Sequence, residues 1–155
     1  MVGVLAVQGA FVEHESALRA VGADTRQVRT AAQLDGLDGL VIPGGESTTV
    51  GLVAGEGGLL DALRRRIGEG LPVFGTCAGM IMLARETTGG EQTLLGAMDT
   101  IVRRNAFGRQ VASFEADLAI DALGDPPMPA VFIRAPWIER CGDDVEVLAT
   151  YDGHI

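Results

Sequence analysis

Residues 72–83 read Pro-Val-Phe-Gly-Thr-Cys-Ala-Gly-Met-Ile-Met-Leu, and this stretch decides the fold. A short apolar strand ends at Gly75, Cys77 follows two residues later, and an apolar helix is predicted from Ala78 to Glu86. A nucleophile between two small residues, placed between a strand and a helix, is the nucleophile-elbow pattern. Glycines are needed there because the turn is strained and its neighbours pack closely against adjacent strands. The sequence therefore predicts a strand–elbow–helix unit centred on a cysteine.

The elbow gives the sulfur of Cys77 a reactive setting. It lifts the thiol above the carboxyl edge of a parallel sheet, where open α/β folds bind ligands. The N-terminus of the following helix presents free N–H groups and a positive dipole end, which lower a thiol pKa and stabilise an oxyanion. The alternative is a buried structural cysteine beside a glycine-rich helix start. Because both the spacing and the strand–helix context are met, we interpret Cys77 as the catalytic nucleophile.

The first ninety residues alternate between strand and helix patterns. Continuous apolar runs, typical of parallel strands covered on both faces, occupy residues 2–7, 39–42 and 72–74. One helical pattern places Phe11, Leu18 and Val21 on a shared face and closes at Gly22, and another carries Leu59, Leu60, Leu63 and Ile67. This alternation predicts a three-layer α/β fold, with helices on both faces of a mostly parallel sheet.

The pattern of predicted elements changes after Gly96. Short strand candidates follow with few helical stretches between them, at residues 101–102, 111–114, 118–120, 131–133 and 145–149. They predict an antiparallel extension of the sheet, and with no linker or repeat we expect residues 1–155 to form a single domain. Residues 151–155 look like a hairpin turn that enters another strand, so we expect the natural protein to continue beyond Ile155 and the chain to lack a C-terminal segment.

Composition excludes several classes of function. Apolar residues make up 47% and charged residues 21%, which is typical of a folded globular protein. The net charge of −9 argues against a nucleic-acid partner, and no apolar run is long enough to span a membrane. Two cysteines without a disulfide framework favour the reducing cytoplasm. The chain has no lysine, so it can use neither a Walker A loop nor a Schiff base. It also offers no Cys/His cluster with the spacing of metal ligands, and we expect no cofactor and no metal site.

A second glycine-rich loop follows the strand at residues 39–42. It reads Pro43-Gly-Gly-Glu-Ser-Thr-Thr49, and its Gly-Gly pair leaves backbone amides uncovered, as an oxyanion loop requires. Taken alone, the segment is better interpreted as an ordinary βα turn in which Ser47 or Thr48 caps the next helix. The first strand is followed by Gln8-Gly9-Ala10, which is not a dinucleotide-binding fingerprint.

Two arginine-containing segments lie in the second half of the chain. Residues 103–110 read Arg-Arg-Asn-Ala-Phe-Gly-Arg-Gln, and Arg134 is expected to end a buried strand. Arginines at strand ends can bind a carboxylate through two parallel hydrogen bonds. A surface salt bridge remains the alternative for Arg109. Cys141 lies in a polar loop without an elbow, and we interpret it as incidental.

Together these segments resemble the glutaminase subunits of pyridoxal 5′-phosphate synthase, which are triad-type (class I) glutamine amidotransferases. The resemblance covers essentially the whole chain and rests on residues 5–11 with 13–14, 43–49, 74–80, 104–110 with 113–115, and 131–136. It implies a flavodoxin-like, class I glutamine amidotransferase-like α/β fold. It also implies hydrolysis of L-glutamine to glutamate and ammonia, the ammonia passing to a separate synthase subunit, a (β/α)₈ barrel, for vitamin B6 biosynthesis.

The resemblance also implies roles for individual residues. Cys77 is the nucleophile by this comparison. The glutamine-binding residues are Gly45, Glu46, Ser47, Arg104, Ile133 and Arg134. The oxyanion donors are the backbone amides of Gly44, Gly45 and Ala78.

The sequence departs from the family pattern at the triad. The family takes its catalytic His and Glu from a His-Pro-Glu-like segment beyond the last strands, and the two histidines of this chain, His14 and His154, lie in no such segment. Without a base, hydrolysis should be severely impaired. We therefore expect residues 1–155 alone not to turn over glutamine. The remaining alternatives are a DJ-1/PfpI-like Cys hydrolase or chaperone, which leaves residues 104–110 unexplained, and a non-catalytic regulatory subunit.

Overall fold

A computed structural model gives the structure of the protein and describes residues 1–46, 56–90, 92–104 and 113–155. Its centre is a four-stranded sheet in the order β2-β1-β3-β4, with every neighbouring pair parallel. The strands are β1 (Val2–Leu5), β2 (Thr25–Val28), β3 (Gly39–Ile42) and β4 (Val73–Gly75). The predicted parallel α/β architecture is therefore confirmed, although β2 was not predicted.

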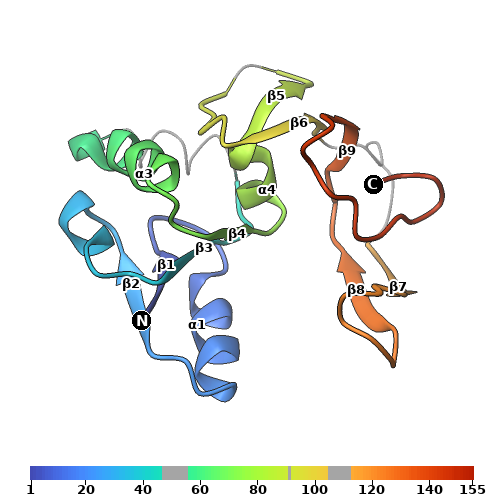
Figure 1. The fold of residues 1–155 in the computed structure, drawn as a ribbon, viewed down its shortest axis with the longest axis horizontal. Coiled ribbons are helices and arrows are strands. Elements are labelled where there is room, and N and C mark those ends of the chain that lie inside the picture. The colour runs from blue at the N-terminus through green and yellow to red at the C-terminus, as the bar shows by residue number, and fades with distance from the viewer. Residues whose placement is uncertain (47–55, 91, 105–112) are drawn as a thin grey trace.

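Helices cover both faces of this sheet (Figure 1). Helix α1 (Phe11–Ala20) lies on one side, and α3 (Leu59–Gly68) and α4 (Ala78–Leu83) lie on the other. Two short 3₁₀ helices, η1 (Ala31–Leu34) and η2 (Glu56–Gly58), precede β3 and α3 respectively. The layers are thus helix, sheet and helix, as the alternation of patterns predicts.

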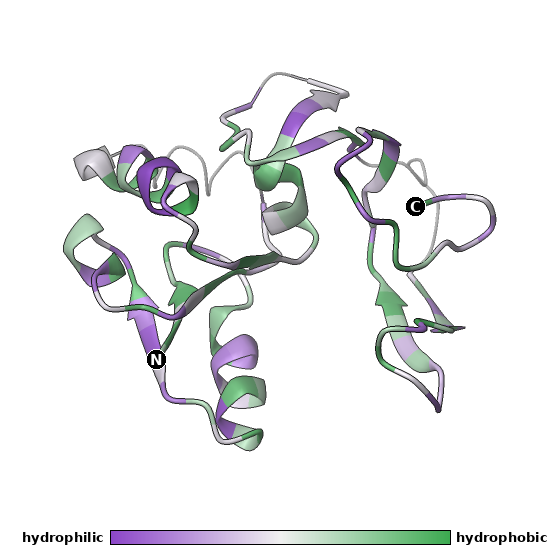
Figure 2. Ribbon diagram, in the orientation of Figure 1, coloured by the Kyte–Doolittle hydropathy of each residue, from purple (hydrophilic) through white to green (hydrophobic). Residues whose placement is uncertain are grey.

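The main hydrophobic core lies between the sheet and the α3 side. Leu5, Leu40 and Ile42 from the strands pack with Leu59 and Leu63 of α3, and all five side chains are buried. Burying a side chain of this size stabilises the fold by about 1.5–3 kcal/mol. Figure 2 shows hydrophobic residues concentrated in β3 and α4. The predicted apolar face of residues 59–67 is confirmed.

The predicted apolar face of α1 is wrong at one end. Val21 lies beyond the helix and is 81% exposed, whereas Glu15, in the middle of the helix, is only 6% exposed. The buried carboxylate accepts hydrogen bonds from Gln27 Nε2 at 2.7 Å and Arg19 Nη2 at 3.1 Å. A polar network therefore links α1 to β2, where the sequence pattern predicted apolar packing.

The helix predicted over residues 78–86 ends earlier than expected. Helix α4 stops at Leu83, and Ala84 begins β5 (Ala84–Thr88), which pairs in parallel with β6 (Met98–Arg103). Strand β9 (Trp137–Cys141), which was not predicted, completes this second sheet by pairing antiparallel to β6. The backbone groups of Ala84 and its successors therefore bond to a neighbouring strand, which stops the helix.

A separate two-stranded hairpin consists of β7 (Phe114–Leu118) and β8 (Met128–Phe132). It stands away from the four-stranded sheet, beside the C-terminal residues (Figure 1). The antiparallel extension is thus confirmed, but residues 145–149 form no strand, and β7 ends at Leu118 where a strand over 118–120 was predicted. Residues 111 and 112 of the 111–114 candidate lie outside the described residues.

Stacked rings hold the C-terminal turn against the hairpin. Tyr151 stacks with Phe114 and Phe132, and the ring of His154 lies 3.8 Å from that of Trp137. The predicted turn over 151–155 is present, because Tyr151 and His154 exchange two backbone hydrogen bonds of 2.8 and 2.9 Å. Among the described residues, no helix combines the length and apolar character that crossing a bilayer needs.

Candidate active site

The elbow at Cys77 has the predicted geometry. Cys77 lies between β4 and α4 with φ 49° and ψ −104°. The residue is exposed to solvent. A Cβ on Gly75 would lie 2.6 Å from the Gly79 backbone, and one on Gly79 would lie 2.0 Å from the Ile42 carbonyl oxygen. Both glycines are therefore required by close packing. A non-glycine residue held at positive φ costs about 1–3 kcal/mol and is typical of functional sites.

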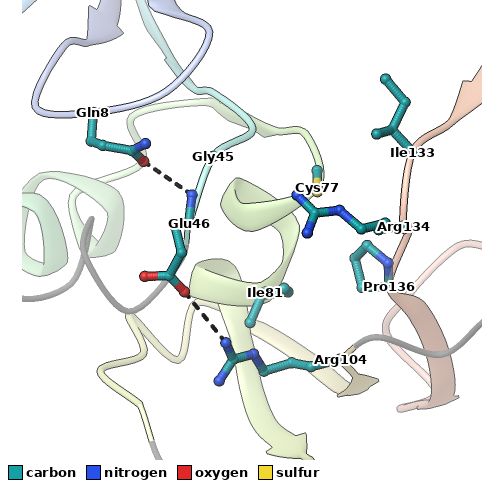
Figure 3. Close-up of a pocket in the computed structure, with 9 residues that line it drawn as sticks. All are labelled: Gln8, Gly45, Glu46, Cys77, Ile81, Arg104, Ile133, Arg134 and Pro136. Atoms are coloured by element: carbon teal, nitrogen blue, oxygen red, sulfur yellow. Dashed lines mark hydrogen bonds and ion pairs between the residues drawn. The ribbon is translucent and has the colours of Figure 1, made fainter. Parts of the chain in front are cut away.

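A pocket of about 360 Å³ opens over this thiol (Figure 3). That size falls within the range of roughly 300–1,000 Å³ that small-molecule sites occupy. The residues that line it are Gln8, Gly45, Glu46, Cys77, Ile81, Arg104, Ile133, Arg134 and Pro136. An exposed nucleophile thus faces a cavity able to admit a free amino acid.

The lining residues converge because three parallel strands end at the same edge of the sheet. Gln8 follows β1, Gly45 and Glu46 follow β3, and Cys77 follows β4. The carboxyl ends of parallel strands are where open α/β sheets place their ligands. The extension supplies further lining residues, since Arg104 comes directly after β6 of the second sheet and Arg134 lies in the segment between β8 and β9.

The Gly44-Gly45 loop is fixed at several backbone atoms. The N–H of Gly44 donates to Thr76 Oγ1 at 3.0 Å, and its carbonyl oxygen accepts from the N–H of Ala10 at 3.0 Å. The N–H of Glu46 donates to Gln8 Oε1, also at 3.0 Å. Of the three predicted oxyanion donors, the Gly44 amide therefore already has a hydrogen-bond partner within the protein.

Two oppositely charged residues of the pocket lining form an ion pair. Arg104 Nη2 lies 3.6 Å from Glu46 Oε1, and the arginine side chain is only 17% exposed (Figure 3). The backbone of Arg104 is held by its N–H, which donates to the Thr88 carbonyl oxygen at 3.1 Å. A carboxylate and a guanidinium at this spacing are suited to the ammonium and the carboxylate of an amino acid.

Arg134 lies in the pocket, but its predicted strand context is wrong. Strand β8 ends at Phe132, and Arg134 occupies a bend with φ 44°. The strand is not buried either, because Val131 is 61% exposed. In Figure 3 the guanidinium of Arg134 extends toward Cys77. Of the three non-glycine residues with positive φ in the described chain, Cys77 and Arg134 line this pocket, which is where strain tends to persist.

Neither histidine of the chain lies in the pocket. His14 Nε2 is 3.0 Å from Thr76 Oγ1, and His154 stacks on Trp137. Ser47 and Arg109, which the sequence analysis singled out, lie outside the described residues. No group of His, Cys, Asp and Glu within the described ranges is arranged to hold a metal ion.

Sequence reasoning missed three lining residues: Gln8, Ile81 and Pro136. Gln8 carried a usable signal, because it directly follows an apolar strand whose end lies at the ligand-binding edge. Ile81 belongs to a helix that looks apolar nearly all round, so nothing in the pattern separates a lining residue from a core residue. Cys141 lies in a different pocket, beside Arg85 and Arg140.

Comparisons with known proteins agree on one family. The profile of the SNO glutamine amidotransferase family matches residues 4–155. Two pyridoxal 5′-phosphate synthase subunits PdxT are close relatives. The one from Pelotomaculum thermopropionicum is 59% identical over 97% of this chain and 76% of its own length. The one from Carboxydothermus hydrogenoformans is 54% identical over 99% of this chain and 81% of its own length.

A solved structure gives the same result for the fold. The crystal structure of a glutamine amidotransferase superposes with a TM-score of 0.93 at 52% identity, covering 99% of this chain and 81% of the other. An identity of 52% indicates a shared family as well as a shared fold. It therefore argues against the alternative of a DJ-1/PfpI-like Cys hydrolase or chaperone. This chain belongs to the SNO glutamine amidotransferase family.

Proposed function

We propose that the family's reaction, the hydrolysis of L-glutamine to glutamate and ammonia, uses Cys77 of this chain as its nucleophile. The observation that carries the proposal is the exposed elbow thiol at the mouth of a pocket that also holds a carboxylate and two guanidinium groups. Membership of a glutamine amidotransferase family supplies the reaction class.

Substrate recognition follows from the charges of the pocket. The α-ammonium group of glutamine binds Glu46, and its α-carboxylate binds Arg104 and Arg134, which replace the contact between Glu46 and Arg104 seen here. Charge-assisted hydrogen bonds of this kind are roughly twice as strong as neutral ones. The side-chain carboxamide then extends toward Cys77.

The chemistry proceeds through a thioester. The thiolate of Cys77 attacks the carboxamide carbon, and the carbonyl oxygen becomes an oxyanion that the amides of Gly45 and Ala78 stabilise. One such donor contributes about 2.7–4 kcal/mol to the transition state. The carbon–nitrogen bond breaks, the leaving nitrogen takes a proton to become ammonia, and water then hydrolyses the thioester to glutamate.

The proton transfers need a base that the described pocket does not contain. His14 and His154 both have other contacts, and the single lining carboxylate among the described residues, Glu46, has Arg104 beside it. We therefore expect residues 1–155 alone to bind glutamine and to be alkylated at Cys77, but not to turn over glutamine.

The fate of the ammonia follows from the relatives, which are subunits of pyridoxal 5′-phosphate synthase. We propose that ammonia passes to a synthase subunit, a (β/α)₈ barrel, for pyridoxal 5′-phosphate formation. The absence of lysine from this chain supports that division, because imine chemistry on sugar phosphates then falls to the partner. The unpaired Cys77 and Cys141 support a cytoplasmic location.

The decisive test is labelling by the chloroketone analogue of L-glutamine, in which a chloromethyl ketone replaces the carboxamide. We expect one equivalent to attach at Cys77, as read by mass spectrometry, and L-glutamine but not D-glutamine to slow the reaction. Cys77→Ser should abolish labelling, and Cys141→Ser should leave it unchanged. If L-glutamine does not slow the labelling of Cys77, the proposal is overturned and a non-catalytic regulatory subunit is favoured.

A further inference from the structure

Thr76, the residue before the nucleophile, joins three parts of the structure through one hydroxyl group. Its Oγ1 lies 3.0 Å from the N–H nitrogen of Gly44 and 3.0 Å from His14 Nε2. Its own backbone is fixed as well, since its N–H donates to the Ile42 carbonyl oxygen at 3.1 Å and its carbonyl oxygen accepts from Gly79 N–H at 2.8 Å. The hydroxyl therefore has a position set by the elbow itself.

The same hydroxyl fixes the Gly44 end of the proposed oxyanion loop. Thr76 holds the amide of Gly44, and Ala10 at the start of α1 holds its carbonyl oxygen. In a trans peptide the C=O and N–H groups point in opposite directions, so the Ala10 contact directs the N–H of Gly45 away from α1. The next amide, that of Glu46, is held by Gln8. Gly45 is thus the one amide of the Gly44–Glu46 run left for a ligand in the described structure.

Close packing leaves this loop little freedom to compensate. A Cβ on Gly44 would lie 3.3 Å from Cys77 Cβ, one on Gly45 would lie 2.4 Å from Gln8 Oε1, and one on Gly9 would lie 2.1 Å from the Gly44 carbonyl oxygen. The loop is therefore pressed between the first βα turn and the elbow. A shift of Gly44 would change the distance between the Gly45 amide and the sulfur.

We propose that Thr76 and His14 form a positioning pair that holds the Gly44-Gly45 peptide in register with Cys77, so that the Gly45 amide meets the oxyanion. The proposal rests on the glutaminase function above. Thr76 Oγ1 accepts the hydrogen bond from the Gly44 N–H, and a second hydrogen bond, to the imidazole of His14, keeps the Thr76 side chain from rotating away. His14 thus acts through Thr76 and touches neither substrate nor sulfur.

Two electrophiles separate positioning from a general structural role. The chloroketone analogue of glutamine reacts through addition of sulfur to its carbonyl, which forms an oxyanion before chloride leaves. Iodoacetamide reacts by direct displacement of iodide and forms none. The ratio of the two second-order rate constants at Cys77 therefore reports the oxyanion site, whereas a loss of folding or of thiol exposure would lower both rates.

We expect Thr76→Val, which keeps the shape and removes the hydroxyl, to lower the chloroketone rate about 10–100-fold, a loss at or below that of deleting one oxyanion donor. The iodoacetamide rate should stay within about twofold, and Thr76→Ser should restore most of the chloroketone rate. His14→Leu should have a smaller effect of the same sign, which His14→Gln partly rescues. The Thr76→Val/His14→Leu double variant should be no slower than Thr76→Val, because coupled residues are not additive.

Thr25→Val is the matched control, because it removes a part-buried hydroxyl that bonds Arg19 and Glu15 far from the pocket. It should leave both rates unchanged. An unchanged rate ratio in Thr76→Val, or equal losses with both electrophiles, would overturn the positioning pair while leaving the proposed function intact. Failure of the unsubstituted chain to show glutamine-protected labelling would instead overturn the function.

Discussion

The two halves of the molecule differ in how they hold their functional residues. The part up to Leu83 contains the parallel sheet and almost all of the hydrophobic core, since beyond it the buried apolar side chains of the described chain are Ala84, Leu95 and Val102. This half supplies the proposed nucleophile and the proposed oxyanion loop. The extension that follows supplies Arg104 and Arg134, and its hairpin is partly exposed, with Val131 of β8 at 61%.

This difference matches the demands of the two tasks. Attack on a carboxamide needs the sulfur and the oxyanion donors placed within fractions of an ångström, and tightly packed glycines beside a parallel sheet provide that precision. Charged contacts to an amino acid tolerate more variation, because long arginine side chains can adjust. Substitutions at the close-packed glycines of the first half should therefore disturb the fold together with the chemistry, whereas substitutions at the arginines of the second half should change substrate binding alone.

The largest effect is expected at Gly79. A Cβ there would lie 2.0 Å from the Ile42 carbonyl oxygen, so Gly79→Ala must push α4 away from β3. We expect the free energy of unfolding in urea to fall by about 3 kcal/mol or more, the range of severe core strain. Gly68→Ala is the control, because open space surrounds that position at the end of α3. It should be neutral or stabilising by up to about 1 kcal/mol. Comparable losses of unfolding free energy in Gly79→Ala and Gly68→Ala would contradict the view that close packing at the elbow fixes this half of the molecule.

Arg104→Gln should show the converse behaviour. We expect the concentration of glutamine that half-protects Cys77 against the chloroketone to rise about 10–100-fold, because a hydrogen bond to a charged group contributes about 1.5–3 kcal/mol. The free energy of unfolding should change little. Arg85→Gln, which removes an exposed ion pair with Asp99 in another pocket, should leave protection unchanged. A destabilised fold with intact protection would assign Arg104 a structural role.

A smaller effect is expected from relieving strain at the nucleophile. Cys77 has φ 49°, which glycine adopts freely, so Cys77→Gly should raise the free energy of unfolding by about 1 kcal/mol while abolishing labelling. Cys77→Ala keeps the strain and should lose labelling without gaining stability. Thermal or urea unfolding of the unsubstituted chain, Cys77→Gly and Cys77→Ala measures the difference in the free energy of unfolding. Equal stability of all three would show that the elbow stores no strain.

The sequence allowed the catalytic half to be predicted well because its signals are local. Gly75, Cys77 and Gly79 lie within five residues, and the apolar runs that become β1, β3 and β4 are continuous. Strand β2 was missed because Thr-Arg-Gln-Val has no apolar run, and its pairing with β1 together with the Glu15 network stabilises it. That information is held in tertiary contacts, outside the strand itself.

The extension was predicted less well for the same reason. Residues 84–86 continue the apolar helical pattern in the sequence, but in the structure they belong to β5, which pairs with β6. Trp137–Cys141 likewise forms a strand by pairing with β6. The arginines were found because their residue type suits a carboxylate, although Arg134 lies in a bend beyond its strand. The contact between His14 and Thr76 joins residues 62 positions apart, and no local pattern could have revealed it.

The smallest effect is expected at the far end of the sheet, where the N-terminal ammonium of Met1 lies 2.7 Å from Asp38 Oδ2. Its hydrogen bond and charge hold the pKa of Asp38 below the ordinary value. A lowered pKa in the folded state means that this contact contributes stability above the ordinary pKa and loses it as the pH falls through the folded value. Asp38 is 83% exposed, so solvent and salt screen the pair. Asp38→Asn should therefore lower the urea midpoint slightly at pH 7 in low salt, and the difference should vanish in high salt or strong acid. A difference that persists under both conditions would mean that Asp38 contributes through packing and not through charge.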